Sequence, residues 1–439
     1  MKLRLQNYKN YAIFAGYFFK KMKTRHLYIF LALFLISCSS KKEDFTPAEV
    51  EQWPVVNVDS IFIDLDKPIL DKKTAQADKV FTNLKKKTSF NGTVLFAEKG
   101  RIVLEKSYGV SNLRTRKGNL DVDDVFQLSS VSKMFTAEAI MILKTRGLLD
   151  YDVDIKQYIP EFPYDGVTVR MLLTHRSGLS RYETLADNNW PDKRKPFTND
   201  NMIDYYVKYK PDPYFRPNNG FHYCNVNYAL LASIVERVSG KSFVDFMRED
   251  VFDAIGMSSS FIYDMPTDTL VSLYLPENCV QGYYIGRRRP RQAQNEYLNG
   301  VKGDKIMFSN VEDMYRFKVA IDYGLLVPDS IQAEAFVPGS PKYSKRKDNY
   351  GFGWRISRKY PGCFYHYGWW KAYRSFFLID TVNDRTLIVL TNTDKGPSSD
   401  VFWKLLRDNT ISLSPASINI PMLEIKSNLK YPYSSYQLR

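Results

Sequence analysis

A serine and a lysine stand three residues apart in Ser130-Val131-Ser132-Lys133, at the start of an expected helix. Residues three apart on a helix lie on one face, about one turn from each other. The positive end of the helix dipole favours an alkoxide on Ser130, and apolar neighbours favour a neutral Lys133 that accepts the serine proton. This pair therefore has the chemistry of a nucleophile and its base.

The S-x-x-K spacing alone is not specific, because it occurs four times in the chain, beginning at Ser39, Ser130, Ser344 and Ser427. The other three matches lie in an expected tether, a basic loop and the C-terminal tail. Only Ser130 precedes a long Ala-, Met- and Leu-rich segment behind an expected hairpin. Without that context, an N-cap serine and a surface lysine would be the preferred interpretation.

Several segments are expected to position this pair. Residues 76–88 predict a leading helix, and residues 91–110 predict a β-hairpin that turns at Glu98-Lys99-Gly100. A mostly helical, loop-rich stretch follows to about residue 320. Residues 363–392 predict two or three strands with a turn at Asn383-Asp384, and residues 400–409 predict a closing helix. Such an order favours an α/β portion split by a helical insertion around one core.

The N-terminal region has the pattern of a bacterial lipoprotein signal. Lys23 and Arg25 precede an apolar run from Leu27 to Ile36, which is too short for a membrane span of ~20 residues. Leu35-Ile36-Ser37-Cys38 resembles the lipobox, whose cysteine is diacylated and becomes the new N-terminus. We expect a signal peptide over 1–37 with a true start at Met22, a lipid on Cys38, and a tether over 38–75. The alternative is an ordinary signal peptide with a chance cysteine.

Composition excludes several classes of protein. The chain has 439 residues, of which 44% are hydrophobic and 25% charged, unlike a disordered chain, a fibre or a polytopic membrane protein. Seven of its 14 net positive charges lie in residues 1–37, and the rest form short clusters such as Lys85-Lys86-Lys87 without any nucleic-acid-binding motif. The cysteine and histidine spacings match no metal motif. We therefore expect no nucleic acid, metal or cofactor.

Five segments, in order, resemble the serine β-lactamase-related family, which includes class C β-lactamases, DD-peptidases, esterases and D-aminopeptidases. They read "FQLSSVSKMFTA", "VRMLLTHRSGLSRYE", "PNNGFHYCNVNYALLASIVE", "DAIGM" and "YGFGWRISRKYPGCFYHYGWWKAYRS". The resemblance spans roughly residues 76–405. It implies an α/β (α+β) fold of the β-lactamase/transpeptidase type, with an antiparallel sheet flanked by helices and a mostly helical insertion. The expected hydrolase domain covers 76–412, with an α/β part at about 76–145 and 305–412, a helical part at about 146–304, and a tail at 413–439.

The resemblance also implies catalytic roles for individual residues. Ser130 matches the nucleophile and Lys133 its base partner. Tyr223-Cys224-Asn225 matches the Y-x-N element, so Tyr223 would shuttle a proton and Asn225 would donate a hydrogen bond to the substrate carbonyl. A lone tyrosine is more often a core residue, and it is the place of Tyr223 in this element that favours catalysis. Whether Lys133 or Tyr223 is the base stays open.

The third matching motif is His366-Tyr367-Gly368. His366 would line the site opposite Ser130, and Gly368 would let the substrate approach the strand edge. The backbone N–H groups of Ser130 and Trp369 would form the oxyanion hole. In the "LLTHRSGL" segment the likeness implies a structural role for His175.

This chain departs from the family pattern at several positions. Lys305-Ile306 replaces a usual Gly pair, and Trp369-Trp370-Lys371 replaces small residues beside the oxyanion hole. Strand alternation allows only one of the two indoles to face the substrate. Because His366 stands where β-lactamases carry lysine, a β-lactam carboxylate loses its obvious cation.

We therefore expect a lipid-anchored serine hydrolase of the bacterial cell envelope, facing the periplasm or the cell surface. It would form an acyl-enzyme on a small-molecule or peptide ester or amide, including cell-wall fragments, as an esterase or D-amino-acid peptidase-like enzyme. The alternatives are a true β-lactamase or DD-carboxypeptidase, and a binding lipoprotein that has kept the fold and lost turnover.

Overall fold

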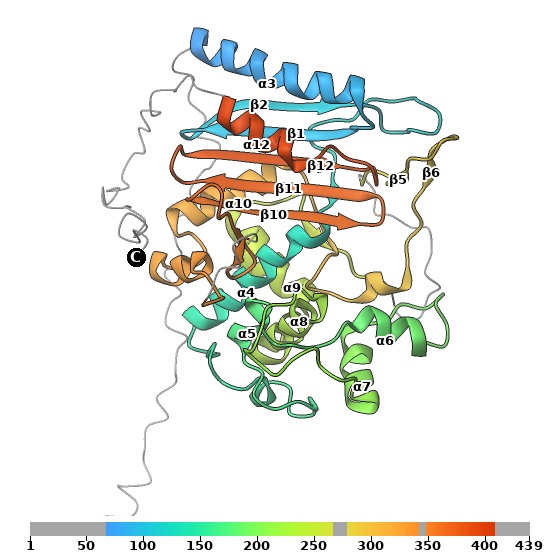
Figure 1. Cartoon of the computed structure of the whole chain (residues 1–439), viewed down its shortest axis with the longest axis vertical. Coiled ribbons are helices and arrows are strands. Elements are labelled where there is room, and N and C mark those ends of the chain that lie inside the picture. Colours follow the sequence, from blue (N-terminus) through green and yellow to red (C-terminus); the bar gives the residue numbers. More distant parts are fainter. Residues whose placement is uncertain (1–66, 267–278, 342–347, 409–439) are drawn as a thin grey trace, which may run out of the picture. The chain divides into compact units, whose positions relative to one another are not determined.

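The computed structural model describes residues 67–266, 279–341 and 348–408 (Figure 1). The expected signal peptide, Cys38 and the S-x-x-K matches at Ser39, Ser344 and Ser427 lie outside the described residues. The helices are α3 (Lys67–Lys87), α4 (Ser132–Thr145), α5 (Val169–Leu173), α6 (Tyr182–Asn189), α7 (Asn199–Tyr209), α8 (Asn225–Ser239), α9 (Phe243–Phe246), α10 (Val311–Tyr323), α11 (Asp329–Gln332) and α12 (Ser399–Asp408). Among the described residues, none of these helices is long and apolar enough to cross a membrane.

The main sheet has seven strands in the order β2-β1-β12-β11-β10-β9-β8, and all of its neighbouring strands are antiparallel. Its strands are β1 (Gly92–Glu98), β2 (Arg101–Tyr108), β8 (Asn349–Tyr350), β9 (Arg355–Ile356), β10 (Cys363–Trp370), β11 (Tyr373–Asp380) and β12 (Arg385–Thr391). A smaller sheet orders β3 (Phe126–Gln127), β7 (Met307–Ser309) and β4 (Phe261–Ile262) as β3-β7-β4, and β5 (Tyr283–Tyr284) pairs with β6 (Arg291–Gln292). Segments from both ends of the hydrolase region thus share one sheet.

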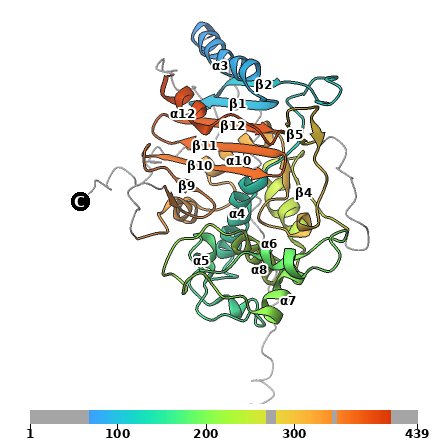
Figure 2. The same cartoon turned by 45° about the vertical axis from the view of Figure 1, so that its right-hand side comes forward.

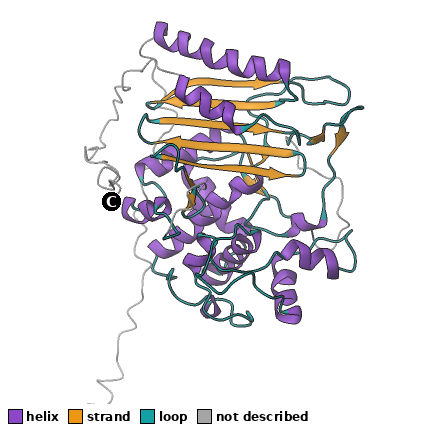
Figure 3. Cartoon of the chain, viewed as in Figure 1, coloured by secondary structure: helices purple, strands orange, loops and turns teal. Residues whose placement is uncertain are grey.

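Helices cover both faces of the main sheet (Figures 1 and 2). Alternating side chains of β11 divide between two buried clusters: Phe376 packs with Phe402 of α12 on one face, and Phe377 packs with Phe317 of α10 on the other. The second face also receives α4, which packs in turn against α8 (Figure 3). The larger core therefore lies between the sheet and the helical part of the chain.

The expected hairpin is confirmed, and its turn follows from local geometry. Lys99 and Gly100 both have positive φ angles, 52° and 74°, as a two-residue turn of type I′ requires. The expected strands after residue 363 are β10, β11 and β12, with Asp384 at φ 49° in the last turn. The closing helix is α12.

The leading helix begins earlier than its sequence pattern indicates. α3 starts at Lys67 rather than at residue 76, so its first residues lie in the segment expected to be the tether. The fully buried Lys73 continues the spacing of Ala77 and Phe81 toward the N-terminus, and its Nζ donates to Oε2 of Glu98 in β1 at 2.6 Å. A charged residue at a core-facing position hid the first two turns from a search for apolar periodicity.

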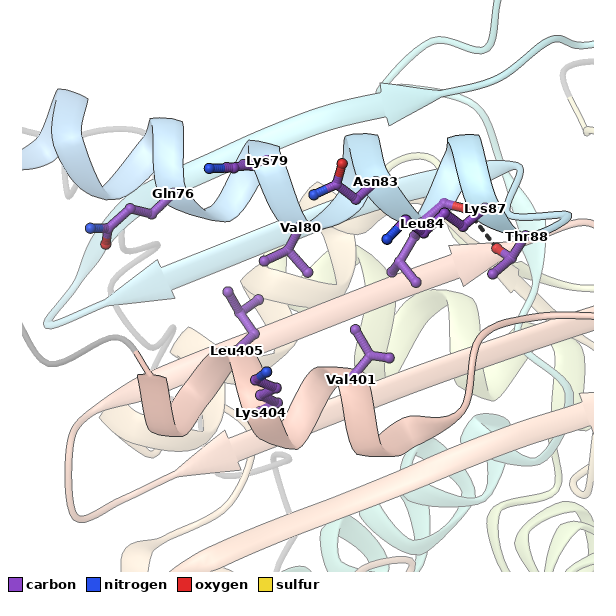
Figure 4. Close-up of a pocket in the computed structure, with 10 residues that line it drawn as sticks. All are labelled: Gln76, Lys79, Val80, Asn83, Leu84, Lys87, Thr88, Val401, Lys404 and Leu405. Carbon is purple, nitrogen blue, oxygen red and sulfur yellow. Dashed lines mark hydrogen bonds between the residues drawn. The ribbon is translucent and has the colours of Figure 1, made fainter.

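The described residues also form a groove between α3 and α12, on the sheet face opposite α4 (Figure 4). Its volume is about 780 Å³, and Val80, Leu84, Val401 and Leu405 line it together with lysine side chains. None of the expected catalytic residues lines this groove.

Candidate active site

The expected nucleophile and its lysine lie together at the start of α4. Lys133 is fully buried, and its Nζ donates hydrogen bonds to Ser130 Oγ at 3.2 Å and to the backbone carbonyl of Asp304 at 2.7 Å. Ser130 is partly exposed and sits in a 3₁₀ turn, Ser129–Val131, immediately before the helix. Ser129 has a φ of 52°, a conformation that costs free energy for a non-glycine residue and is often found at functional turns. The hydroxyl is thus accessible while the amine is enclosed.

Strand β10 approaches this turn closely at Gly368. A Cβ atom there would lie 2.3 Å from the carbonyl oxygen of Leu128 and 2.9 Å from Cβ of Ser129. The glycine therefore permits contact between β10 and the turn that carries Ser130. The sequence predicted that Gly368 makes room for a substrate at the strand edge. In the structure it makes room for the protein itself, because an added Cβ would point at the nucleophile turn. The contact brings the backbone of Trp369 beside the nucleophile turn.

Among the described residues, one edge of β10 has no partner strand from His366 onward. Strand β9 pairs with β10 only at Phe364 and Tyr365, and in the described part of the chain no strand pairs with that edge from His366 onward. An open strand edge offers backbone N–H and C=O groups to an extended ligand. A peptide-like substrate can therefore lie along β10 next to Ser130.

Tyr223 stands beside the lysine. Lys133 Nζ lies 5.1 Å from the centroid of the Tyr223 ring, and the Tyr223 hydroxyl is buried with no hydrogen-bond partner in the described residues. His175 holds the following residue in place, since its Nδ1 accepts a hydrogen bond from the backbone N–H of Cys224 at 3.2 Å. The Tyr223 hydroxyl is thus left with an unused hydrogen-bonding capacity next to the lysine.

Asn225 begins α8 and makes a contact that the sequence did not reveal. Its amide Nδ2 donates to Oε1 of the buried Glu183 at 2.7 Å, while its Oδ1 is buried with no hydrogen-bond partner. The expected donation to a substrate carbonyl would require the second amide hydrogen or a turn of the side chain. Cys224 points into the core, with its Sγ 3.6 Å from the carbonyl oxygen of Ser180.

His366 is a neutral, fully enclosed ring. Its Nδ1 donates to the carbonyl of Tyr367 at 2.8 Å, so its Nε2, 3.0 Å from the Tyr350 hydroxyl, accepts a hydrogen bond from it. Burial, reinforced by the positive charges of Arg355 and Lys133, holds the pKa of His366 well below its ordinary value. This residue supplies shape and hydrogen bonds to the site, not positive charge.

The positive charge near His366 comes from Arg355 in β9. Its guanidinium carbon lies 5.1 Å from the ring centroid of Tyr223 and 4.5 Å from that of Tyr367. Its Nε is buried without a hydrogen-bond partner, and no carboxylate of the described chain pairs with it. A cation thus lies near His366, although His366 itself stands where β-lactamases carry lysine.

The two tryptophans after Gly368 point to opposite faces of β10. Trp369 is 63% exposed and stacks with Arg374, whose guanidinium carbon lies 5.1 Å from its ring. Trp370 shares the face of His366 and Gly368, donates from Nε1 to Oδ1 of Asn299 at 2.9 Å and packs against the larger core. Trp370 is thus the indole on the side of the nucleophile.

Sequence reasoning missed Arg355, Glu183 and Tyr350 as members of this site. None lies in a motif with catalytic spacing, and each reaches the site through a contact across the fold. A weak signal existed for Arg355, since it lies 11 residues before His366 in a segment already singled out.

The fold, the open edge of β10 and the Ser–Lys pair define a serine hydrolase with the β-lactamase/transpeptidase-like architecture. The Beta-lactamase family model matches residues 77–410, and the chain belongs to this family. Both the expected family and the expected fold class are thereby confirmed.

Individual relatives agree with this assignment. Penicillin-binding protein 4* of Bacillus subtilis is 32% identical over 336 residues, which cover 72% of this chain and 71% of that protein. A D-aminopeptidase of Cereibacter sphaeroides is 26% identical over 260 residues, covering 58% of this chain and 47% of that protein. A penicillin-binding protein structure from Bacillus halodurans has a TM-score of 0.64 at 23% identity, covering 74% of this chain and 98% of that one.

Proposed function

We propose that this protein is a membrane-anchored serine hydrolase that forms an acyl-enzyme on an ester or amide, with esterase or D-amino-acid peptidase-like activity. The observation that carries the proposal is the 3.2 Å contact between a fully buried lysine amine and the partly exposed hydroxyl of Ser130. The buried amine is thereby held within hydrogen-bond reach of the hydroxyl proton that a general base must remove.

The proposed reaction has two steps. Ser130 Oγ attacks the substrate carbonyl and its proton passes to Lys133 or Tyr223, while the N–H groups of Ser130 and Trp369 hold the oxyanion. The same proton then goes to the leaving alcohol or amine, which departs. In the second step a water attacks the acyl-serine and releases the acid, and the serine regains its proton.

Substrates with a free carboxylate are favoured by Arg355. Its guanidinium stands between Tyr223 and Tyr367 without an acidic partner in the described chain, and planar recognition of carboxylates is the ordinary task of such an arginine. The D-aminopeptidase among the relatives supports peptides with D-amino acids, and hence cell-wall fragments, as substrate candidates. Because penicillins and DD-carboxypeptidase substrates carry such a carboxylate, Arg355 favours their binding as well.

Covalent labelling of Ser130 tests the proposed function. Purified protein is treated with a fluorophosphonate or a fluorescent penicillin, and the labelled peptide is identified by mass spectrometry. We expect one label on Ser130, none in Ser130→Ala, and loss of p-nitrophenyl ester hydrolysis in that variant. A folded wild-type protein that is neither labelled nor active would instead support the alternative of a binding lipoprotein without turnover.

The proposed anchor needs its own experiment. Lipidation of Cys38 should place the protein in the membrane fraction, since two acyl chains give stable anchoring. Cys38→Ala should leave an uncleaved or unlipidated form. Wild-type protein in the soluble fraction with an unmodified Cys38 would contradict the anchor and leave the hydrolase proposal intact.

A further inference from the structure

Beside Lys133 lies a buried ion pair between Asp304 and Lys305, and its lysine stands where the family pattern has a glycine. Lys305 and Asp304 are 1% and 0% exposed, and Lys305 Nζ lies 3.1 Å and 3.2 Å from the two carboxylate oxygens of Asp304. The fully buried Tyr182 of α6 joins them: its hydroxyl lies 2.6 Å from Lys305 Nζ and donates to Asp304 Oδ2 at 2.9 Å. The carboxylate therefore has a cation and a hydroxyl as partners, out of contact with solvent.

The same aspartate supports Lys133 through its backbone. The carbonyl of Asp304 accepts the 2.7 Å hydrogen bond from Lys133 Nζ. Neighbouring carbonyls are also held, because Thr136 donates to Gly303 at 2.6 Å and Gln127 donates to Lys305 at 3.2 Å. The side-chain cluster and these hydrogen bonds together fix the Asp304 carbonyl, which accepts the hydrogen bond from the Lys133 amine.

The charges of the pair belong to the residue whose backbone carbonyl binds Lys133 and to the residue after it. A carboxylate within about 4–6 Å of an amine favours its ammonium form, which cannot accept a proton. Lys305 supplies the compensating positive charge, and its ammonium also lies 5.0 Å from the ring centroid of Trp370. Without Lys305, the Asp304 carboxylate would be buried with the Tyr182 hydroxyl as its partner, on the residue whose backbone carbonyl binds Lys133.

We propose that Lys305 and Tyr182 are positioning residues for acylation: they neutralise the Asp304 carboxylate and hold the Asp304 carbonyl against Lys133, and thereby fix this amine beside Ser130 and influence the pH at which it accepts a proton. The proposal rests on the proposed roles of Ser130 and Lys133. It gives a function to Lys305, which together with Ile306 replaces the usual Gly pair of the family.

Other groups around Lys133 contribute little variable charge near neutral pH. Burial keeps the pKa values of His175 and His366 well below the ordinary value, and raises that of the Cys224 thiol to about 12. The charged and titratable groups that face Lys133 or its immediate neighbours are Ser130, His175, Tyr182, Glu183, Tyr223, Cys224, Tyr228, Asp304, Lys305, Tyr350, Arg355 and His366. Arg355 keeps its charge throughout the accessible range.

The test is the pH dependence of kcat/KM for a p-nitrophenyl ester, measured on the full chain. Lys305→Met should move the acid limb of the profile upward by about one pH unit, which lowers kcat/KM about tenfold at pH values well down that limb. Asp304→Asn should move the limb in the opposite direction, because Lys305 then adds an uncompensated positive charge beside Lys133. The double variant should return the limb to its wild-type position, and Lys305→Arg should keep it there. Tyr182→Phe should move it upward by less than Lys305→Met does.

A matched control separates this effect from simple loss of stability. Lys73 and Glu98 form another buried pair at 2.6 Å, on the sheet face opposite α4. Lys73→Met should lower the thermal midpoint and leave the acid limb in place. If Lys305→Met does not fold, the Asp304→Asn and double variants carry the test.

Opposite shifts in the two single variants, cancelling in the double, would support the proposal. Folded variants whose limbs stay in place, or that move in the same direction, would overturn it. The titration of Lys133 followed by ¹³Cε NMR, with its signal assigned through Lys133→Met, gives the same answer without turnover. A wild-type protein that never acylates would thus refute the proposed function and still leave the positioning proposal to be decided by NMR.

Discussion

Replacing Trp370 by alanine should widen the acyl-binding cleft, whereas the same change at Trp369 should leave the cleft as it is. Trp370 lies on the β10 face that meets the nucleophile turn, and Trp369 is 63% exposed on the opposite face. The two residues are adjacent and chemically identical. Any difference between the variants therefore reports the face of the strand and not the loss of an indole as such.

The expected magnitude follows from the crowding that a bulky substrate meets. Overpacking a well-filled site costs about 1–3 kcal/mol, and a factor of ten corresponds to about 1.4 kcal/mol. In Trp370→Ala the kcat/KM ratio of a bulky to a small substrate should therefore rise about 5- to 150-fold. In Trp369→Ala the ratio should change less than about twofold, as for a surface residue.

Trp370→Ala should also lose more unfolding free energy than Trp369→Ala. Trp370→Ala removes the hydrogen bond to Asn299 and the aromatic face that Lys305 approaches at 5.0 Å. We expect it to cost about 2–4 kcal/mol of unfolding free energy, and Trp369→Ala about 0.5 kcal/mol. Urea denaturation of both variants measures this difference.

The assay compares p-nitrophenyl acetate with nitrocefin as the bulky substrate, and uses acylation rates with a fluorescent penicillin if nitrocefin turnover is too slow to measure. Equal ratios in wild type and both variants would show that neither indole shapes the cleft. A larger effect at Trp369 would refute the assignment of the strand faces.

Three further predictions concern the same site. Lys133→Ala and Tyr223→Phe should each lower kcat/KM about 10³-fold or more and the double variant little further, because such groups act as a unit; additive losses would contradict a shared proton-transfer step. Gly368→Ala should lower activity at least about 100-fold and reduce the thermal midpoint, since its Cβ would lie 2.3 Å from a backbone carbonyl of the nucleophile turn; an unchanged variant would disprove that contact. Burial holds the pKa values of His175 and His366 below the value of about 6.5 in the unfolded chain, so below that pH the unfolded state binds more protons. The unfolding free energy should therefore reach its full value above about pH 6.5 and decrease as the pH drops to 5, and it should decrease less steeply in His366→Gln. Equal slopes of unfolding free energy against pH, measured by urea denaturation, would contradict a depressed histidine pKa.

Local pattern was sufficient for much of the scaffold. The β1–β2 hairpin follows from alternation and from a turn whose Lys99 and Gly100 take positive φ angles, and the turn at Asp384 similarly separates β11 from β12. Helix α4 follows from an apolar run, which is buried from Ser132 to Leu143. In each case the residues that decide the structure are neighbours in the chain, so their spacing carries the information. The order of five motifs was in the same way enough to predict the family.

Contacts across the fold decided the rest. Arg355 reaches Tyr223 only because β9 and the loop before α8 meet at the site, and no spacing in the chain records that meeting. Lys73 escaped the helix pattern because its partner, Glu98, lies on another element. Burial of the Lys73 ammonium is costly unless a partner of opposite charge is brought to it, and that partner is set by packing in three dimensions. For the same reason, sequence alone indicated that only one of the two indoles after Gly368 can face the substrate, and only the packing of β10 shows that Trp370 lies on the face of the nucleophile turn.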